Sequence, residues 1–154
     1  MKYKQAIKTI GAVSTIGTSL LLAGIMALAD TNTKAGPLTL VKIMQDQGMY
    51  MEKITAGIIR EDWQQVSESA LRIAGHPQPP LTEKIRILGF VGSDVNTYKN
   101  YDKKTSQAGQ ELSQAAERQD GILVVSAFAT LQTSCLSCHQ HFRIPFQEYF
   151  YEHR

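Results

Sequence analysis

Several features are scarce or absent in this 154-residue sequence, and each of them excludes a class of fold or function. It has two cysteines, no block of like charge, and no basic cluster larger than Lys103-Lys104. It shows neither the polar–apolar alternation typical of β-strands nor an internal repeat. No pair of carboxylates, Ser-His constellation or nucleotide-binding loop suggests catalysis. We therefore expect neither a β-fold, nor a nucleic-acid-binding protein, nor an enzyme.

Both cysteines belong to one short motif, Cys135-Leu136-Ser137-Cys138-His139. The C-x-x-C-H spacing is the attachment signature of a c-type haem. Two thiols three residues apart lie on one helical face, so each can add to a vinyl group on the same porphyrin edge. The adjacent imidazole is then carried under the iron. The motif predicts one covalent haem c, with thioethers at Cys135 and Cys138 and His139 as the proximal axial iron ligand.

Three other interpretations of the motif remain open. A thioredoxin-like dithiol would lie near a βαβ pattern, which the sequence lacks. A zinc site could use Cys135, Cys138 and either His139 or His141, but it would need a fourth ligand, and no second cysteine knuckle is present. A disulfide between Cys135 and Cys138 would leave His139 without a role. Haem attachment accounts for all three residues of the motif.

Residues 1–29 are predicted to be a signal peptide. A basic start precedes a mostly apolar stretch from Ile10 to Leu28, and Ala27-Leu28-Ala29 matches a signal-peptidase site. Because the apolar stretch is long enough to cross a bilayer, an uncleaved membrane anchor is the alternative. Either way the C-terminal body is exported. We expect it in the periplasm, or on the outer face of the inner membrane if the anchor is retained.

Cleavage after Ala29 leaves residues 30–154, which is 125 residues and the size of one domain. Three of the 16 Lys and Arg residues precede the cleavage site and none of the 14 Asp and Glu residues does, so the body has a formal charge of −1. The basic character of the whole chain therefore comes from its leader.

Turn signals divide the body into helices. Four long ones are expected, from about Pro37 or Leu38 to Arg60, from Asp62 to Ala74, from Ser93 or Asp94 to Arg118, and from Ile122 to His141. A short helix or turn is expected after Thr82 as its N-cap. His76 is expected to be exposed in the proline-rich connector. The predicted fold class is all-α, an antiparallel four-helix bundle with covalent haem on the last helix.

The first long helix carries an apolar stripe at alternating steps of three and four residues. Its members are Val41, Met44, Gly48, Met51, Thr55 and Ile58. After the last helix, the aromatic residues Tyr149, Phe150 and Tyr151 are expected to cover one end of the bundle, and His153 is expected to lie in a frayed tail.

A four-helix body with C-x-x-C-H near its C-terminal end resembles the cytochrome c′ family. The run Cys135-x-x-Cys138-His139-x-x-Phe142-Arg143 is similar to the family pattern C-x-x-C-H-x-x-(F/Y)-R, and the resemblance covers essentially the whole exported body. It implies a haem held between helices, with Arg143 near the haem or its propionates. From the residues alone, Arg143 could equally be a surface cation at a helix end.

The resemblance also bears on the sixth iron position. High-spin members of the family block this position with an apolar side chain from the first helix, whereas low-spin relatives bind the iron through a Met of that helix. Met44 lies at the matching place and is the candidate distal axial ligand, ahead of Met51 and Met49. A thioether is a soft ligand on a flexible stem, and Gly48 leaves room for a flat macrocycle. Core packing is the alternative role for a Met at this spacing.

These features together predict an exported electron carrier with one His/Met-ligated haem. Such ligation raises the reduction potential of the haem. The alternative is a five-coordinate binder of small gases such as nitric oxide, with Val41 and Met51 crowding an open distal side. An unidentified redox partner protein is expected. The resemblance also implies a homodimer. The chain would meet a membrane only if the leader is uncleaved.

Overall fold

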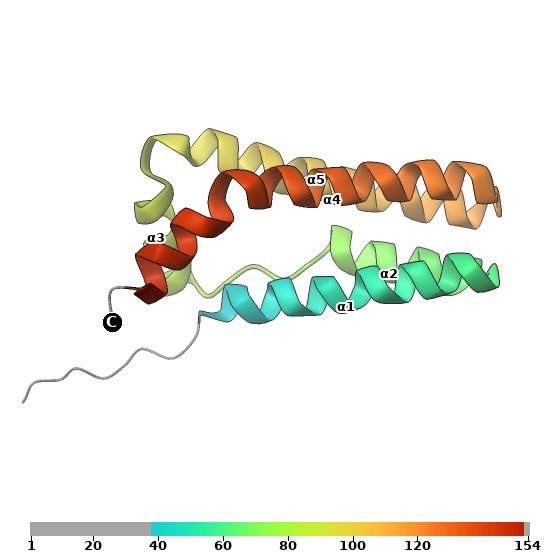
Figure 1. Cartoon of the computed structure of the whole chain (residues 1–154), viewed down its shortest axis with the longest axis horizontal. Helices are drawn as coiled ribbons and strands as arrows, with labels where there is room; N and C mark the ends of the chain where they lie inside the picture. The colour runs from blue at the N-terminus through green and yellow to red at the C-terminus, as the bar shows by residue number, and fades with distance from the viewer. Residues whose placement is uncertain (1–37, 153–154) are drawn as a thin grey trace, which may run out of the picture. The chain divides into compact units, whose positions relative to one another are not determined.

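The computed structural model describes residues 38–152, which form an all-α bundle without a strand (Figure 1). The elements are α1 (Thr39–Arg60), α2 (Trp63–Ala74), α3 (Leu81–Val91), a 3-10 turn η1 (Gly92–Asp94), α4 (Val95–Glu117), α5 (Gly121–Gln147) and a π-helical turn η2 (Glu148–Glu152). This confirms the predicted fold class at the level of an all-α bundle. The predicted leader and His153 lie outside the described residues.

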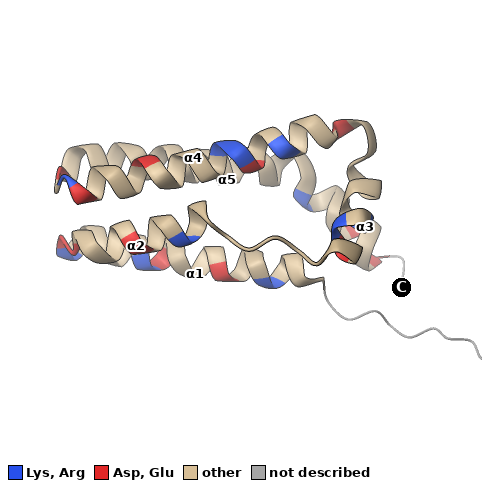
Figure 2. Ribbon diagram, turned by 180° about the vertical axis from the view of Figure 1, so that it is seen from behind, with Lys and Arg blue, Asp and Glu red and all other residues tan. Residues whose placement is uncertain are grey.

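The four long helices lie side by side in an order that leaves one side open. α1 packs on α2, α2 on α4 and α4 on α5, whereas α1 and α5 touch each other sparingly. Short turns join α1 to α2 and α4 to α5, so both pairs are hairpins that turn at the same end of the bundle (Figures 1 and 2). The first and last helices of the described chain therefore flank the open side.

The two hairpin turns are built in the same way. Glu61 and Gln119 adopt left-handed backbone conformations, with φ of 56° and 55°. Each is followed by an aspartate, Asp62 or Asp120, whose carboxylate accepts a hydrogen bond of 3.0 Å from the backbone N–H three residues on. Such N-caps satisfy a donor that the first helical turn leaves free. The helix starts near 62 and 121 were predictable for this reason.

The core is formed mainly where α2 and α4 meet. Its largest fully buried side chains are Ile54, Ile73, Leu112, Leu131, Val66 and Val124. The helices approach closely at Gly109 of α4, where an added Cβ would lie 2.9 Å from the carbonyl oxygen of Ala70. Glycine is required there because the backbone of α2 occupies the space that a side chain would need.

α3 secures the start of α1. Leu38, the N-cap position of α1, makes no side-chain cap hydrogen bond. The carboxylate of Glu83 replaces that cap, accepting hydrogen bonds of 2.7 Å from the backbone N–H groups of both Thr39 and Leu40. Glu83 is 8% exposed. The predicted N-cap at Thr82 is wrong, since α3 begins at Leu81 and its N-cap residue is Pro80. Proline is tolerated at the start of a helix because the backbone N–H that it lacks would have no helical partner there.

The last helix continues beyond the predicted end at His141, through Gln147, and Pro145 lies inside it. α5 bends toward its C-terminal end (Figure 1), as expected where a proline removes a backbone hydrogen bond. After the bend Phe150 is buried, with its ring centroid 5.8 Å from that of Phe90 and 4.5 Å from that of Phe146. The expectation that aromatic residues cover an end of the bundle is confirmed for Phe150.

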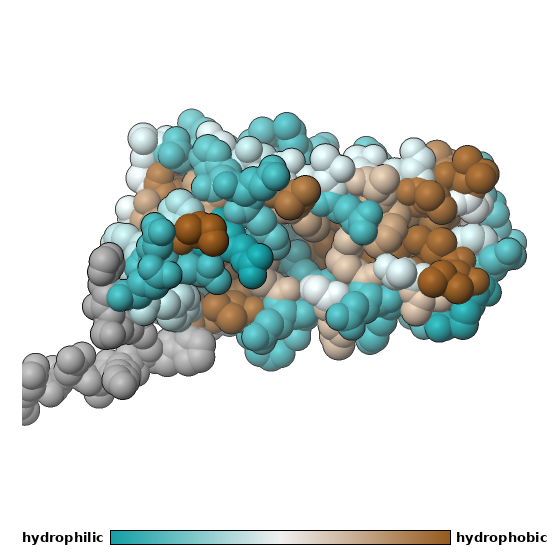
Figure 3. Space-filling model, viewed as in Figure 1, coloured by the Kyte–Doolittle hydropathy of each residue, from teal (hydrophilic) through white to brown (hydrophobic). Residues whose placement is uncertain are grey.

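α5 is poor in charge and rich in exposed apolar residues. No Asp, Glu, Lys or Arg occurs between Gly121 and Phe142, and the charged residues of the bundle lie mostly on the other helices (Figure 2). Apolar side chains reach the surface along this helix (Figure 3), with Ile122 85% exposed. Within residues 38–152, Gly121–Glu152 is the one helical stretch long and apolar enough to cross a membrane. Its buried residues pack in the bundle core.

Candidate cofactor site

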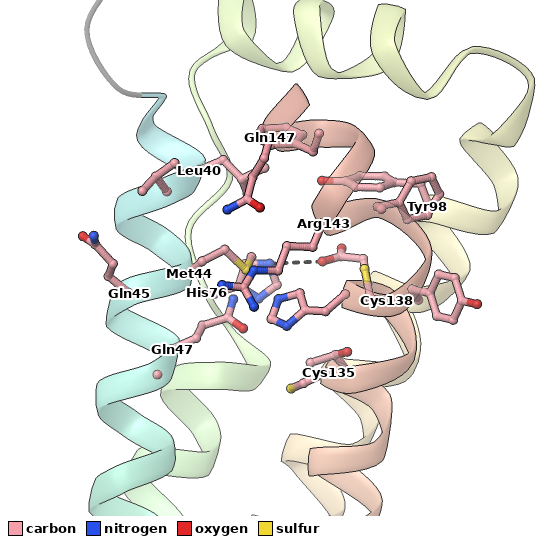
Figure 4. Close-up of a pocket in the computed structure, with 18 of the residues that line it drawn as sticks. Leu40, Met44, Gln45, Gln47, His76, Tyr98, Cys135, Cys138, Arg143 and Gln147 are labelled. Atoms are coloured by element: carbon pink, nitrogen blue, oxygen red, sulfur yellow. Dashed lines mark ion pairs between the residues drawn. The ribbon is translucent and has the colours of Figure 1, made fainter. Parts of the chain in front are cut away.

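A cavity of about 680 Å³ lies on the open side of the bundle, between α1 and α5 (Figure 4). Its wall is completed by His76 of the connector and by residues of α3, α4 and η2. Cofactor and ligand sites are typically concave, mostly apolar and roughly 300–1,000 Å³ in volume. The cavity has the size and position of a cofactor site.

All five predicted site residues line this cavity. Cys135, Cys138, His139 and Arg143 reach it from α5, and Met44 reaches it from α1. Figure 4 shows Cys135 pointing from α5 toward α1, with Arg143 extending across the cavity in the same direction. The fold thus brings a motif near the C-terminus opposite a helix near the start of the described chain.

Only part of the predicted apolar stripe on α1 lines the cavity. Val41, Met44, Gly48 and Met51 line the cavity, whereas Thr55 is exposed. Met49 does not line it. Met44 is 38% exposed, so a large part of this residue is not packed against other side chains. Periodicity alone could not distinguish these roles, because a face that lines a cavity is as apolar as one that packs against a helix.

Gly48 leaves open space in the cavity wall. A Cβ added at Gly48 would have no heavy atom within 4 Å. At Gly57, on the same helix, an added Cβ would lie 2.8 Å from the Val66 side chain. The difference shows that α1 packs closely against α2 at Gly57 but faces unfilled space at Gly48.

The two thiols are free and partly buried in the cavity wall. Burial raises the pKa of Cys135 above its usual value. Burial also raises the pKa of Cys138 to about 11, with smaller contributions from the negative charges of Asp102 and Cys135. Thiolates, not thiols, are the nucleophiles of disulfide exchange and the ligands of zinc. Both thiols are protonated at pH 7, which disfavours the dithiol interpretation.

The zinc interpretation also lacks a gathered set of donors. Among residues 38–152, no group of three or more His, Cys, Asp or Glu side chains is placed to hold a metal ion. His141 does not line the cavity; its ring packs against Phe142 and Tyr101, with centroid distances of 4.4 and 6.0 Å. It therefore cannot join Cys135 and Cys138 without rearrangement.

His139 has the protonation state that metal binding requires. Partial burial lowers the pKa of His139 below its usual value, and the positive charge of Arg143 lowers it further. The imidazole is therefore neutral at pH 7, with a ring nitrogen available to a metal.

The expectation that His76 is exposed is wrong. Its side chain is 11% exposed, and its Nε2 lies 3.1 Å from Oδ1 of Asp102 on α4. Its Nδ1 lies 3.0 Å from the carbonyl oxygen of Ile73. Both His76 and Asp102 line the cavity. A His that follows a helix-ending glycine is usually expected to be exposed. Its partner Asp102 belongs to a different helix, and the sequence alone does not show that this helix packs beside His76.

The raised pKa of Cys138 predicts its reactivity. In the haem-free protein, Cys138 should react with iodoacetamide much more slowly at pH 7 than a free cysteine, and the rate should rise steadily as the pH approaches 11. Asp102→Asn removes a negative charge that raises this pKa, so it should speed labelling of Cys138 more than that of Cys135. Mass spectrometry of the labelled peptides measures both rates. Labelling of Cys138 as fast as a free thiol at pH 7 would contradict this.

Comparisons of this chain with known protein families, with curated proteins and with solved structures found no match. The functional proposal therefore depends on the residues of the cavity and on the fold that brings them together.

Proposed function

We propose that this protein is an exported electron carrier with one covalent haem c, attached at Cys135 and Cys138 and ligated by His139 and Met44. One observation carries the proposal: the two thiols, the imidazole and the thioether all line one cavity, although they come from the first and last helices of the described chain. The resemblance of the motif to the cytochrome c′ family supports the same conclusion.

The residues present fit a haem in three respects. The cavity has the volume of a cofactor site. Gly48 leaves space beside α1, where a side chain would otherwise lie. Two protonated thiols and one neutral imidazole stand together on the wall formed by α5. Arg143 would place a positive charge near the propionates. When bound, the haem would supply an iron that gains and loses one electron, at a potential that Met/His ligation raises.

The rest of the wall suits an electron carrier. Phe90, Phe142 and Phe146 line the cavity and would keep water from the ring. Asp102, the carboxylate in the wall, is paired with His76 and is not free to act as a general base. We also propose that the protein works outside the cytoplasm with a partner redox protein; export depends on the leader, residues 1–29.

The visible spectrum of the protein, produced in a host that attaches haem, tests the proposal. We expect a sharp low-spin spectrum in the reduced state and a weak far-red sulfur-to-iron band in the oxidised state. Met44→Ala should abolish that band. Met51→Ala is the matched control, since Met51 also lines the cavity one stripe position further along α1, and should preserve it. A colourless protein would refute the proposal.

A second candidate, a five-coordinate binder of small gases such as nitric oxide, is favoured by the exposure of Met44 and the space at Gly48. If Met44 does not bind the iron, the sixth position remains open. In that case the unmodified protein should show a broad high-spin spectrum that shifts when carbon monoxide or nitric oxide is added.

A further inference from the structure

The His76–Asp102 pair is the polar feature of the cavity wall that the electron-carrier proposal leaves without a role. It joins the connector after α2 to the middle of α4, and both side chains line the cavity (Figure 4). His76 is 11% exposed and Asp102 is 47% exposed on their side chains. Asp102 is therefore the more accessible member of the pair.

The partners of His76 determine its protonation state. Nδ1 faces a backbone carbonyl oxygen at 3.0 Å and Nε2 faces a carboxylate oxygen at 3.1 Å. Both partners accept hydrogen bonds and donate none, whereas a neutral imidazole has one N–H. The doubly protonated ring satisfies both contacts. In agreement, the hydrogen bond to Asp102 raises the pKa of His76, against the opposing effect of burial.

The cavity wall holds other titratable groups besides the pair. The α1 wall contributes none. The groups from α4, α5 and η2 are Tyr98, Tyr101, Cys135, Cys138, His139, Arg143 and Tyr151. The pKa of Tyr98 is raised to about 12 and that of Cys138 to about 11. Both cysteines would be consumed by attachment, His139 would be held by the iron, and an arginine keeps its charge.

The pair is electrostatically close to the edge where the haem would attach. The negative charge of Asp102 raises the pKa of Cys138 and that of Tyr98, so its field extends to one of the two attachment points. Charges separated by a partly buried wall are screened less than charges on the surface. A change of one unit of charge at the iron should therefore alter the proton affinity of the pair.

Building on the proposed function, we infer that His76 and Asp102 form a proton-binding site linked to the redox state of the haem. One electron from a donor redox protein converts ferric to ferrous iron, and one proton from solvent binds to His76. The physical cause is repulsion, because the extra positive charge of ferric iron opposes the imidazolium. His76 should bind its proton at least threefold more tightly in the ferrous state.

The test is the reduction potential of the haem-loaded protein as a function of pH. The potential should fall as the pH rises between the ferric and ferrous proton affinities of His76, and it should be flat on either side. His76→Gln and Asp102→Asn should each remove most of this slope; the second alters a half-exposed residue and guards against a folding defect in the first. His141→Gln is the control, since His141 is exposed and outside the cavity.

The outcomes separate this inference from the proposed function. A coloured protein whose potential does not vary with pH, or varies as much in both variants as in the unmodified protein, would overturn the proton site and leave the electron carrier standing. A colourless protein would overturn both. Proton NMR of His76 in the haem-free chain gives a second readout. Titration of His76 above its ordinary range, lost in Asp102→Asn, supports the pair, and titration at or below that range overturns it.

Discussion

The Gly48→Phe variant should fold normally but carry at least tenfold less haem than the unmodified protein. A Cβ added at Gly48 meets no heavy atom within 4 Å, and Gly48 lines the cavity, so a larger side chain there would extend from open space into the cavity. Replacing a helix-interior glycine also raises helix propensity by about half a kcal/mol. The aromatic ring would then occupy the space that we assign to the macrocycle. The absorbance of haem per mole of purified protein measures the effect.

Gly89→Phe is the matched control. Gly89 also lies inside a helix with no heavy atom within 4 Å of an added Cβ, but it does not line the cavity. It should therefore keep the full haem content. If Gly48→Phe retained haem as well as Gly89→Phe does, the macrocycle would not lie against α1, and Met44 could not be its ligand.

The Glu83→Ala variant should lose about 3 kcal/mol or more in free energy of unfolding, since two hydrogen bonds to a charged group contribute roughly 1.5–3 kcal/mol each. Two backbone N–H groups, those of Thr39 and Leu40, would lose their carboxylate partner. The negative charge that stabilises the N-terminal end of the helix dipole would also be lost. Urea unfolding measures the loss. Hydrogen exchange at Thr39 and Leu40 should show where it arises.

Two further variants sharpen this test. Glu83→Gln keeps the shape and an acceptor oxygen but removes the charge, so it should fall between Glu83→Ala and the unmodified protein. Glu68→Ala removes a glutamate whose contact is an exposed hydrogen bond to Gln64, and it should cost at most about 0.5 kcal/mol. A loss at Glu83 no larger than that at Glu68 would show that α3 does not secure α1.

The features that could be predicted from the sequence are those set by contacts between residues close to one another in the chain. Asp62 and Asp120 cap helices that begin within three residues of them, so those boundaries were predictable. The C-x-x-C-H motif places its three side chains within one turn of a single helix. The stripe on the first helix also indicated which Met residues could share a face with Gly48.

What could not be predicted depends on contacts between distant residues. Glu83 caps a helix whose first residue lies 44 positions earlier, and no local pattern marks such a cap. His76 is buried by Asp102, which belongs to a stretch of α4 that looks like an ordinary polar surface. The last helix was predicted to end at His141, whereas α5 continues through Gln147, and Phe150 beyond it packs against Phe90 of the distant α3.

The position of the cavity between the first and last helices has a consequence for biogenesis. Each hairpin can form from neighbouring residues as it emerges, because its helices are joined by short turns. The cavity cannot, since α1 provides one wall and α5 the other. As the chain is made from its N-terminus, the wall that carries Met44 appears before the wall that carries the thiols. The binding site is thus the last part of the molecule to be assembled, and a truncated chain would present only half of it.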